Sequence, residues 1–318
     1  MTSRRSFLTA AAAGSAAACS PPVWDAVAGP PAAEETGTPP PTRIDAHVHV
    51  WTPDTDAYPL AAGESVESMR PPSFRPEELF AVQRGSGVTR TVLIQMSFYG
   101  FDNRYMLDVI REHPGKFAGV AVVDLARPDL AETSRRLARQ GVRGFRLYAL
   151  ADRIRDWGRS PEIDRVWRVA GDQGLVIGCL ADPEALPAID RMCQRFPDTA
   201  VVIDHFARIG MRPPADPEDV ARLCRLARHD NVAVKTSAFY ALGEKRPPYD
   251  DLAPLFRQVR DAFGAERLMW GSDCPYQVQG IHTYEASIGL IGRLPFLDAA
   301  ERTAILGGTA DRIYFSKK

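Results

Sequence analysis

The chain has 318 residues, of which 45% are hydrophobic and 25% are charged, and its formal net charge is −1 at pH 7. This is the composition of a globular protein with enough residues for a large core. The near-zero net charge gives no indication of a nucleic-acid or anionic-membrane partner. No apolar run reaches the roughly 18 residues of a transmembrane helix.

Residues 1–28 resemble a twin-arginine (Tat) export signal. Arg4 and Arg5 precede an Ala-rich apolar run at 7–18, an order typical of signal peptides. Ala26-Val27-Ala28 fits cleavage by signal peptidase, whereas a lipid anchor at Cys19 lacks the usual Leu three residues earlier. We therefore expect a periplasmic or other extracytoplasmic protein, with lipidation at Cys19 as the alternative. Residues 29–42, rich in Pro, Gly, Thr, Ala and Glu, are predicted to form a disordered linker.

Residues 43–51 are predicted to form a strand because polar and apolar residues alternate. Such alternation places Asp45, His47 and His49 on one face. Two imidazoles two residues apart can converge on one ion or substrate atom, and imidazole is the commonest metal ligand. A half-buried strand with a polar outer face is the alternative, but that face would normally carry Thr, Lys or Ser.

A Pro-containing loop at 52–73 follows and is interpreted as a cover over the site. Strands and helices then alternate, several helices beginning with Ser or Asp before Pro, as N-caps do. The predicted strands lie at 89–96, 117–123, 144–148, 175–179, 200–205, 232–236 and 268–271, and the helices at 76–86, 103–113, 128–140, 160–174, 182–196, 216–228, 249–263 and from 284 onward.

This alternation of eight strands with helices predicts a parallel sheet in an α/β fold. The length of the mature chain, without the predicted signal, is close to the roughly 250 residues of a (β/α)₈ TIM barrel. Residues 43–318 are therefore expected to form one barrel domain. An open doubly wound sheet would prefer a Gly-rich phosphate turn after its first strand, and the chain has none there.

Catalytic groups of such barrels stand at the carboxyl ends of the strands. Those ends carry His47 and His49, then His205, and finally Asp273. His113 and His229 instead end helices, where they suit the helix dipole.

Three motifs at these ends resemble the amidohydrolase superfamily, and more narrowly its amidohydrolase-2 branch of lactonases and metal-dependent decarboxylases. They are Asp45-Ala46-His47-Val48-His49, Val202-Ile203-Asp204-His205 and Leu268-Met269-Trp270-Gly271-Ser272-Asp273-Cys274-Pro275. The resemblance covers residues 43 to about 315 and implies a divalent metal, usually zinc, on His47, His49, His205 and Asp273. Asp273 would also take a proton from the attacking water, and His205 would bind the metal or polarise the substrate carbonyl.

The fifth strand departs from the metal-binding members, since it carries Gly178-Cys179-Leu180 where another His is common. A metal-free mechanism therefore stays open, in which Asp273 activates water directly and the histidines stabilise the oxyanion.

Four further side chains are candidates for substrate binding. Arg146 would pair with a structural acid or bind a substrate carboxylate, and the resemblance favours the substrate. Tyr148 and Tyr99 would line the pocket or pack, and Lys235 would contact substrate unless the register shifts by one residue. Asp45 would orient an imidazole, and Cys274 would line the site.

Together these features predict an exported hydrolase that opens a lactone or related carbonyl compound with water. The expected partner is a small-molecule substrate, with a carboxylated one as an option, and a homo-oligomer is left open. A non-oxidative decarboxylase on the same scaffold and a barrel that binds a metabolite without turnover are the alternatives.

Replacing Arg4 and Arg5 by Lys should keep the protein in the cytoplasm of a Tat-competent bacterium, as measured by fractionation. The matched control changes the second Arg-Arg pair, Arg135 and Arg136, to Lys and should leave export intact. Unchanged export of the first variant would contradict a Tat signal.

Overall fold

The structure, a computed structural model, describes residues 42–150, 154 and 157–316. The predicted signal and all but the last residue of the predicted linker lie outside these residues. In the described part of the chain no helix is both long and apolar enough to cross a membrane.

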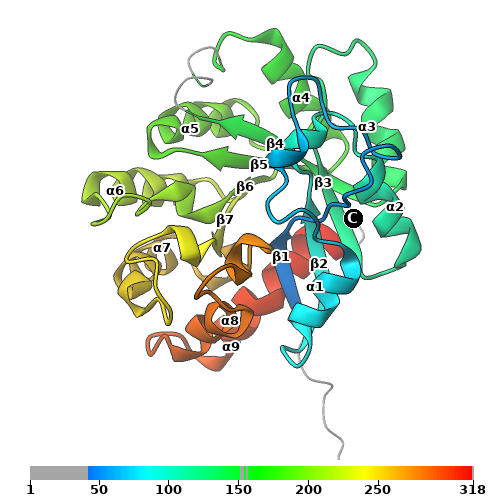
Figure 1. The fold of residues 1–318 in the computed structure, drawn as a ribbon. Helices are drawn as coiled ribbons and strands as arrows, with labels where there is room; N and C mark the ends of the chain where they lie inside the picture. The colour runs from blue at the N-terminus through cyan, green and yellow to red at the C-terminus, as the bar shows by residue number, and fades with distance from the viewer. Residues whose placement is uncertain (1–41, 151–153, 155–156, 317–318) are drawn as a thin grey trace, which may run out of the picture. The chain divides into compact units, whose positions relative to one another are not determined.

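Eight parallel strands, each hydrogen-bonded to the next along the chain, form the sheet (Figure 1). The TIM barrel predicted from the alternation is confirmed. The strands are β1 (Arg43–Val48), β2 (Val88–Ile94), β3 (Phe117–Ala121), β4 (Val142–Ala149), β5 (Val176–Ala181), β6 (Val201–Ile203), β7 (Val232–Ser237) and β8 (Leu268–Gly271).

Helices follow the strands around the outside of the barrel, as Figure 1 shows. They are α1 (Pro76–Gln83), α2 (Arg104–Glu112), α3 (Leu130–Arg139), α4 (Pro161–Asp172), α5 (Leu186–Arg195), α6 (Pro217–Arg225), α7 (Ala253–Phe263), α8 (Tyr284–Arg293) and α9 (Ala299–Thr303). After α9, helical turns continue over Ala304–Gly308, where Gly307 is buried. The glycine is needed there for packing, since a Cβ would collide with the Thr42 carbonyl.

The inside of the barrel is filled by alternate residues of the strands. One buried cluster combines Ile44, Ala46, Val92, Ile94, Ala118, Val120, Val176, Val202, Ala233 and Met269 with Ala310 and Tyr314. The last two come from the C-terminal segment, red in Figure 1, which therefore closes the amino-terminal end of the barrel. The opposite end is left for polar side chains.

A β-bulge in β1 changes which residues face inward. The pairing of β1 with β2 shifts register between Asp45 and Val48, and such an extra residue reverses the alternation of faces. Asp45 consequently points to the helices, where its Oδ2 accepts a hydrogen bond from the Tyr284 hydroxyl of α8 (2.9 Å). The prediction that Asp45 shares a face with His47 and His49 is wrong for this reason.

The barrel closes where β1 meets the segment after β8. The Asp273 amide donates to the His47 carbonyl, and the His49 amide donates to the Cys274 carbonyl, both at 2.8 Å. Gly271 permits this approach, because a Cβ there would stand 2.9 Å from the Cβ and backbone nitrogen of His47. The closing hydrogen bonds thus bring the two halves of the predicted site together.

Asp45 stabilises the same closure of the barrel, called the seam below, where β1 meets the segment after β8. Its Oδ1 accepts hydrogen bonds from the Ser272 amide (2.8 Å) and the His47 amide (3.2 Å), while burial raises its pKa to about 6. The expectation that Asp45 orients an imidazole is therefore corrected: its carboxylate holds backbone amides of both strand ends.

Asp45→Ala should lower the free energy of unfolding by about 3 kcal/mol, because several buried donors lose their acceptor. Tyr284→Phe removes one of these bonds and should cost about 1 kcal/mol. Urea denaturation measures both, with Asp56→Ala at an exposed aspartate as the matched control. A loss for Asp45→Ala no larger than that of the control would contradict the role of the seam.

Candidate active site

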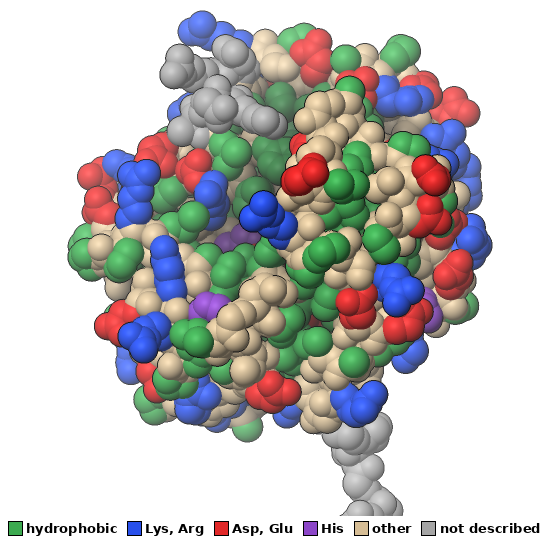
Figure 2. Space-filling model, viewed as in Figure 1, with side chains coloured by type: hydrophobic (Ala, Val, Ile, Leu, Met, Phe, Trp, Pro, Cys, Tyr) green, Lys and Arg blue, Asp and Glu red, His purple; other side chains and the backbone are tan. Residues whose placement is uncertain are grey.

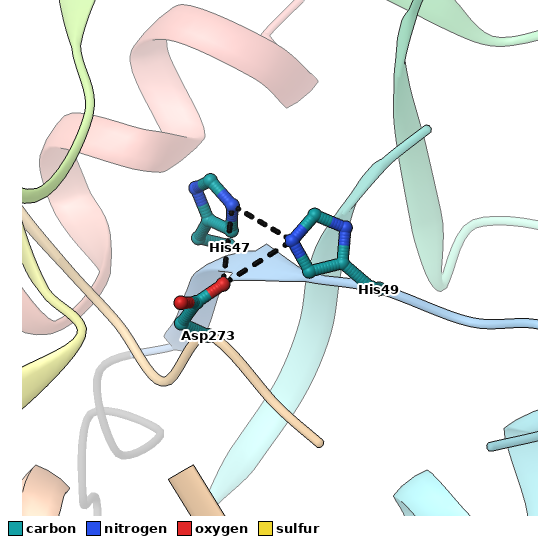
Figure 3. Close-up of side chains that lie close together, drawn as sticks. All are labelled: His47, His49 and Asp273. Carbon is teal, nitrogen blue, oxygen red and sulfur yellow. Dashed lines mark hydrogen bonds and ion pairs between the residues drawn. The ribbon is translucent and has the colours of Figure 1, made fainter. Parts of the chain in front are cut away.

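The four residues expected to form the site meet at the carboxyl-terminal rim of the barrel. His47 and His49 come from the end of β1, His205 follows β6, and Asp273 follows β8. All four are buried. Figure 3 shows the side chains of His47, His49 and Asp273 pointing toward one another.

His47, His49 and Asp273 place three ligand atoms in a nearly equilateral triangle. The two Nε2 atoms lie 3.3 Å apart, and Asp273 Oδ1 lies 3.4 Å from that of His47 and 3.2 Å from that of His49. Zinc binds nitrogen and oxygen at about 2.0–2.2 Å, which places tetrahedral ligands roughly 3.3–3.5 Å apart. The donor set therefore fits a divalent metal in both chemistry and spacing.

Neighbouring groups leave these imidazoles suited to binding through Nε2. His49 Nδ1 donates to the Ile94 carbonyl (2.8 Å), so its Nε2 carries the lone pair. His47 Nδ1 lies between Asp204 Oδ1 (3.4 Å) and Lys235 Nζ (3.2 Å). As a metal ligand through Nε2, His47 would direct its Nδ1 proton to Asp204, the kind of partner that metal-bound histidines use. Burial, with the nearby charges of Lys235 and His205, holds the pKa of His47 well below its ordinary value. The neutral form, which is the ligand form, is favoured.

His205 lies beside the triangle rather than in it. Its Nδ1 hydrogen-bonds with Ser237 Oγ (2.8 Å), and its Nε2 is 4.0 Å from Asp273 Oδ2. Burial lowers its pKa to about 4. With His47 and Asp204 it makes a second group with ligand atoms within 4.8 Å of one another. Its position suits contact with either a metal or a substrate carbonyl.

The backbone of two of these residues is strained. Asp273 has a φ of 65° and His205 a φ of 55°, in the left-handed region that costs non-glycine residues about 1–3 kcal/mol. Strain of this kind concentrates at functional sites.

Asp273 is held as a carboxylate by groups on both of its oxygens. Burial alone would raise its pKa, but the neighbouring imidazoles of His205, His49 and His47 bring it well below the usual range. On the other side, the Tyr240 hydroxyl donates to Oδ2 (2.7 Å). Oδ1 thus faces the imidazoles while Oδ2 is fixed by the tyrosine.

Asp204 is a site residue that the sequence reasoning did not single out. It is buried and forms ion pairs with Lys235 (Nζ to Oδ1, 3.1 Å) and with Arg146 (Nε to Oδ2, 3.5 Å). Burial would raise the pKa of Asp204, but Lys235, His47 and Arg146 lower it well below its usual range. Strand parity could have found it, since Asp204 is two residues beyond Val202 of the inner cluster.

The rim encloses an open cavity of about 1110 Å³. Figure 2 shows hydrophobic side chains, in green, around a hollow with histidine, in purple, at its floor. Arg146 and Tyr148 line this cavity together with His49, His205, Tyr240 and Asp273. The predicted cover contributes Glu64 to the wall.

Three residues that were predicted to contact the substrate or line the site do not line the cavity. Lys235 is 1% exposed and directs its ammonium to Asp204 and to His47 Nδ1 (3.2 Å). Tyr99 is buried, and its hydroxyl donates to the Thr52 carbonyl (3.4 Å). Cys274 is fully buried. These three support the site from outside the cavity.

Residues 44–315 match the sequence model of the amidohydrolases, amidohydrolase-2 branch. The chain belongs to this family. The resemblance seen in the three motifs is thereby confirmed, and the protein is a hydrolase.

Relatives of this amidohydrolase act on lactones. An L-fucono-1,5-lactonase from Burkholderia ambifaria is 32% identical over 86% of this chain and 95% of its own. A 2-pyrone-4,6-dicarboxylate hydrolase from Comamonas testosteroni is 29% identical over 73% and 76%. A crystal structure of an amidohydrolase from Burkholderia multivorans with bound zinc has a TM-score of 0.73 at 26% identity, covering 86% of this chain and 99% of that one.

Tyr240→Phe should lower kcat about tenfold or more with little change in KM, because a hydrogen bond to a carboxylate contributes about 1.5–3 kcal/mol. Steady-state kinetics measure both constants. Tyr276→Phe, at another tyrosine of the cavity wall, is the matched control and should keep kcat within about twofold. Equal effects of the two changes would contradict a positioning role for Tyr240.

Proposed function

We propose that this amidohydrolase opens a lactone with water, using Asp273 as the general base. The arrangement of Asp273 carries the proposal: an ionised carboxylate, fixed by Tyr240 and facing two imidazoles, lies at the floor of an open cavity. The lactonase and pyrone-dicarboxylate hydrolase among its relatives support the same reaction class.

The residues suggest the course of the reaction. Asp273 Oδ1 takes a proton from water while the water oxygen bonds to the lactone carbonyl carbon. His205, which lies nearer to Oδ2 of Asp273 than to Oδ1, lines the cavity, where it can stabilise the developing oxyanion. The ring carbon–oxygen bond then breaks, and the alkoxide receives the proton from Asp273, which leaves a hydroxy acid.

We propose zinc as the metal, held by His47, His49 and Asp273 with His205 beside them. When bound, such an ion lowers the pKa of a bound water to about 7 and polarises a carbonyl oxygen. The protein's own groups prepare the site, since Ile94 and Asp204 orient the two imidazoles. Without metal, the same Asp273 acts as base and His205 as the oxyanion partner.

Arg146 is proposed to bind the substrate. It lines the cavity, and its Nε atom, 3.5 Å from Asp204 Oδ2, has no hydrogen-bond partner among the described residues. Because this Nε is buried against Asp204, the terminal nitrogens of the guanidinium are the donors proposed for a substrate carboxylate or hydroxyl group. Tyr148 on the same wall is proposed as a further contact. Export through the Tat signal would place this reaction outside the cytoplasm.

A panel of sugar lactones, alkyl lactones and carboxylated lactones, assayed by acid release, tests this function. Asp273→Asn should lower kcat at least a thousandfold while the melting temperature stays close to wild type, since the base is lost but the shape is kept. Asp56→Asn at an exposed site is the matched control. Full activity of Asp273→Asn, or no turnover of any lactone, would contradict the proposal.

The same assay distinguishes the two forms of the mechanism. Activity that disappears on chelation and returns with stoichiometric zinc supports the metal, and His49→Ala should then lose bound zinc by elemental analysis. Full activity of a protein shown to be free of metal would contradict the zinc proposal and leave the lactonase proposal standing.

A further inference from the structure

The cavity is much larger than the ring of a small lactone. A cyclic ester of about ten non-hydrogen atoms takes at most roughly 300 Å³, counting about 30 Å³ for each as for a liquid water molecule. The cavity has about 1110 Å³. Ligand pockets usually enclose most of the ligand surface. We therefore expect the part of the cavity that the lactone ring does not fill to bind a second part of the substrate.

The cavity has a polar end and an apolar arm. The polar end is the rim described above, with Asp273 and the histidines. The apolar arm extends beyond the ends of β3, β4 and β5 to the start of α4, and is lined by Val123, Leu125, Leu147, Trp157, Ile163 and Leu180. Arg146 and Tyr148, on the same strand as Leu147, also line the cavity.

Charged groups on the side of the arm already have partners. Asp124 Oδ1 accepts a hydrogen bond from the Ala126 amide (2.9 Å), and Glu162 accepts one from the Ser160 hydroxyl (2.7 Å). Neither acid therefore needs a polar substituent of the substrate to complete its hydrogen bonds. The apolar surface between them is best covered by hydrocarbon.

The mouth of the cavity provides an independent observation. Phe101 is 61% exposed and Met211 is 37% exposed, and both line this cavity. They are two of the four large hydrophobic residues that are exposed in the described part of the chain. Both side chains therefore add exposed apolar surface to the cavity wall.

We propose that the apolar arm binds an alkyl or acyl chain on the lactone, so that preferred substrates carry such a chain rather than several hydroxyl groups. This rests on the proposed lactone hydrolysis. The ring carbonyl lies at Asp273 and the chain extends along Leu147, Leu125 and Leu180. A sugar lactone would fill the polar end but leave the arm in contact with water.

The test is a series of five-membered lactones with unbranched chains of zero, three, five and seven carbons on the ring. Burial of each methylene contributes up to about 0.8 kcal/mol, so kcat/KM should rise as much as about fourfold per carbon until the arm is filled. A polyhydroxylated lactone should be a poorer substrate than the seven-carbon compound. A flat series, or a preference for the polyhydroxylated lactone, would overturn the inference.

Variants locate the effect. Leu125→Asn and Leu180→Asn, at partly buried positions of the arm, should each lower the ratio of kcat/KM for the longest and shortest lactones about tenfold. Leu306→Asn, a partly buried leucine away from the cavity wall, should leave this ratio unchanged. An unchanged ratio in both arm variants would overturn the assignment of the arm.

Failure of the lactonase proposal is distinguishable from failure of this inference. If some lactones turn over without dependence on chain length, only the inference fails. If no lactone turns over, calorimetry with 2-alkylcyclopentanones tests the arm by itself. Binding that tightens with chain length and weakens in Leu125→Asn supports the arm, and binding without that pattern contradicts it.

Discussion

The seam between β1 and β8 is the constraint on which the site depends. Two backbone hydrogen bonds close it, from Asp273 to His47 and from His49 to Cys274. They join the same residues whose side chains form the triangle of possible metal ligands. Closing the barrel and assembling the site are therefore one event, and Asp45, which holds amides of both strand ends, serves the chemistry without touching it.

Balanced charge inside the barrel follows from this geometry. Burying an ionised group without a partner costs several kcal/mol, and the interior of this barrel holds two carboxylates and two cations. Lys235 and Arg146 face Asp204, which in turn lies beside His47 Nδ1. Asp273 instead contacts the histidines and accepts a hydrogen bond from Tyr240. One carboxylate is thus committed to structure, and the other keeps an oxygen directed at the place where a reaction can occur.

The strand ends and the loops contribute different parts of the cavity. Reactive groups come from strand ends, where short segments and strained backbone hold them rigidly. The walls that surround a substrate come instead from loops after β2, β3 and β6 and from the start of α4. Loops on a rigid scaffold can change without disturbing the barrel, so the walls can change while the groups at the strand ends stay in place.

Much of this molecule was predictable from local patterns. Alternating strands and helices indicated the barrel, and the rule that catalytic groups stand at strand ends selected His47, His49, His205 and Asp273. The barrel and the position of these four residues at its rim are confirmed, because period and capping depend on neighbours in the chain; their catalytic roles stay predictions. The strongest sequence signal, the His-x-His strand, was correctly placed at the rim.

Other features were decided only by tertiary structure. The face of Asp45 depends on a bulge set by pairing with β2, and Lys235 turned to Asp204, 31 residues earlier in the chain, rather than to the cavity. Tyr240 reaches Asp273 from a loop after β7, and Tyr99 turned to Thr52. The sequence by itself determined which residues stand at the barrel's rim. Their partners were decided in three dimensions, because distances between remote segments depend on how the barrel closes.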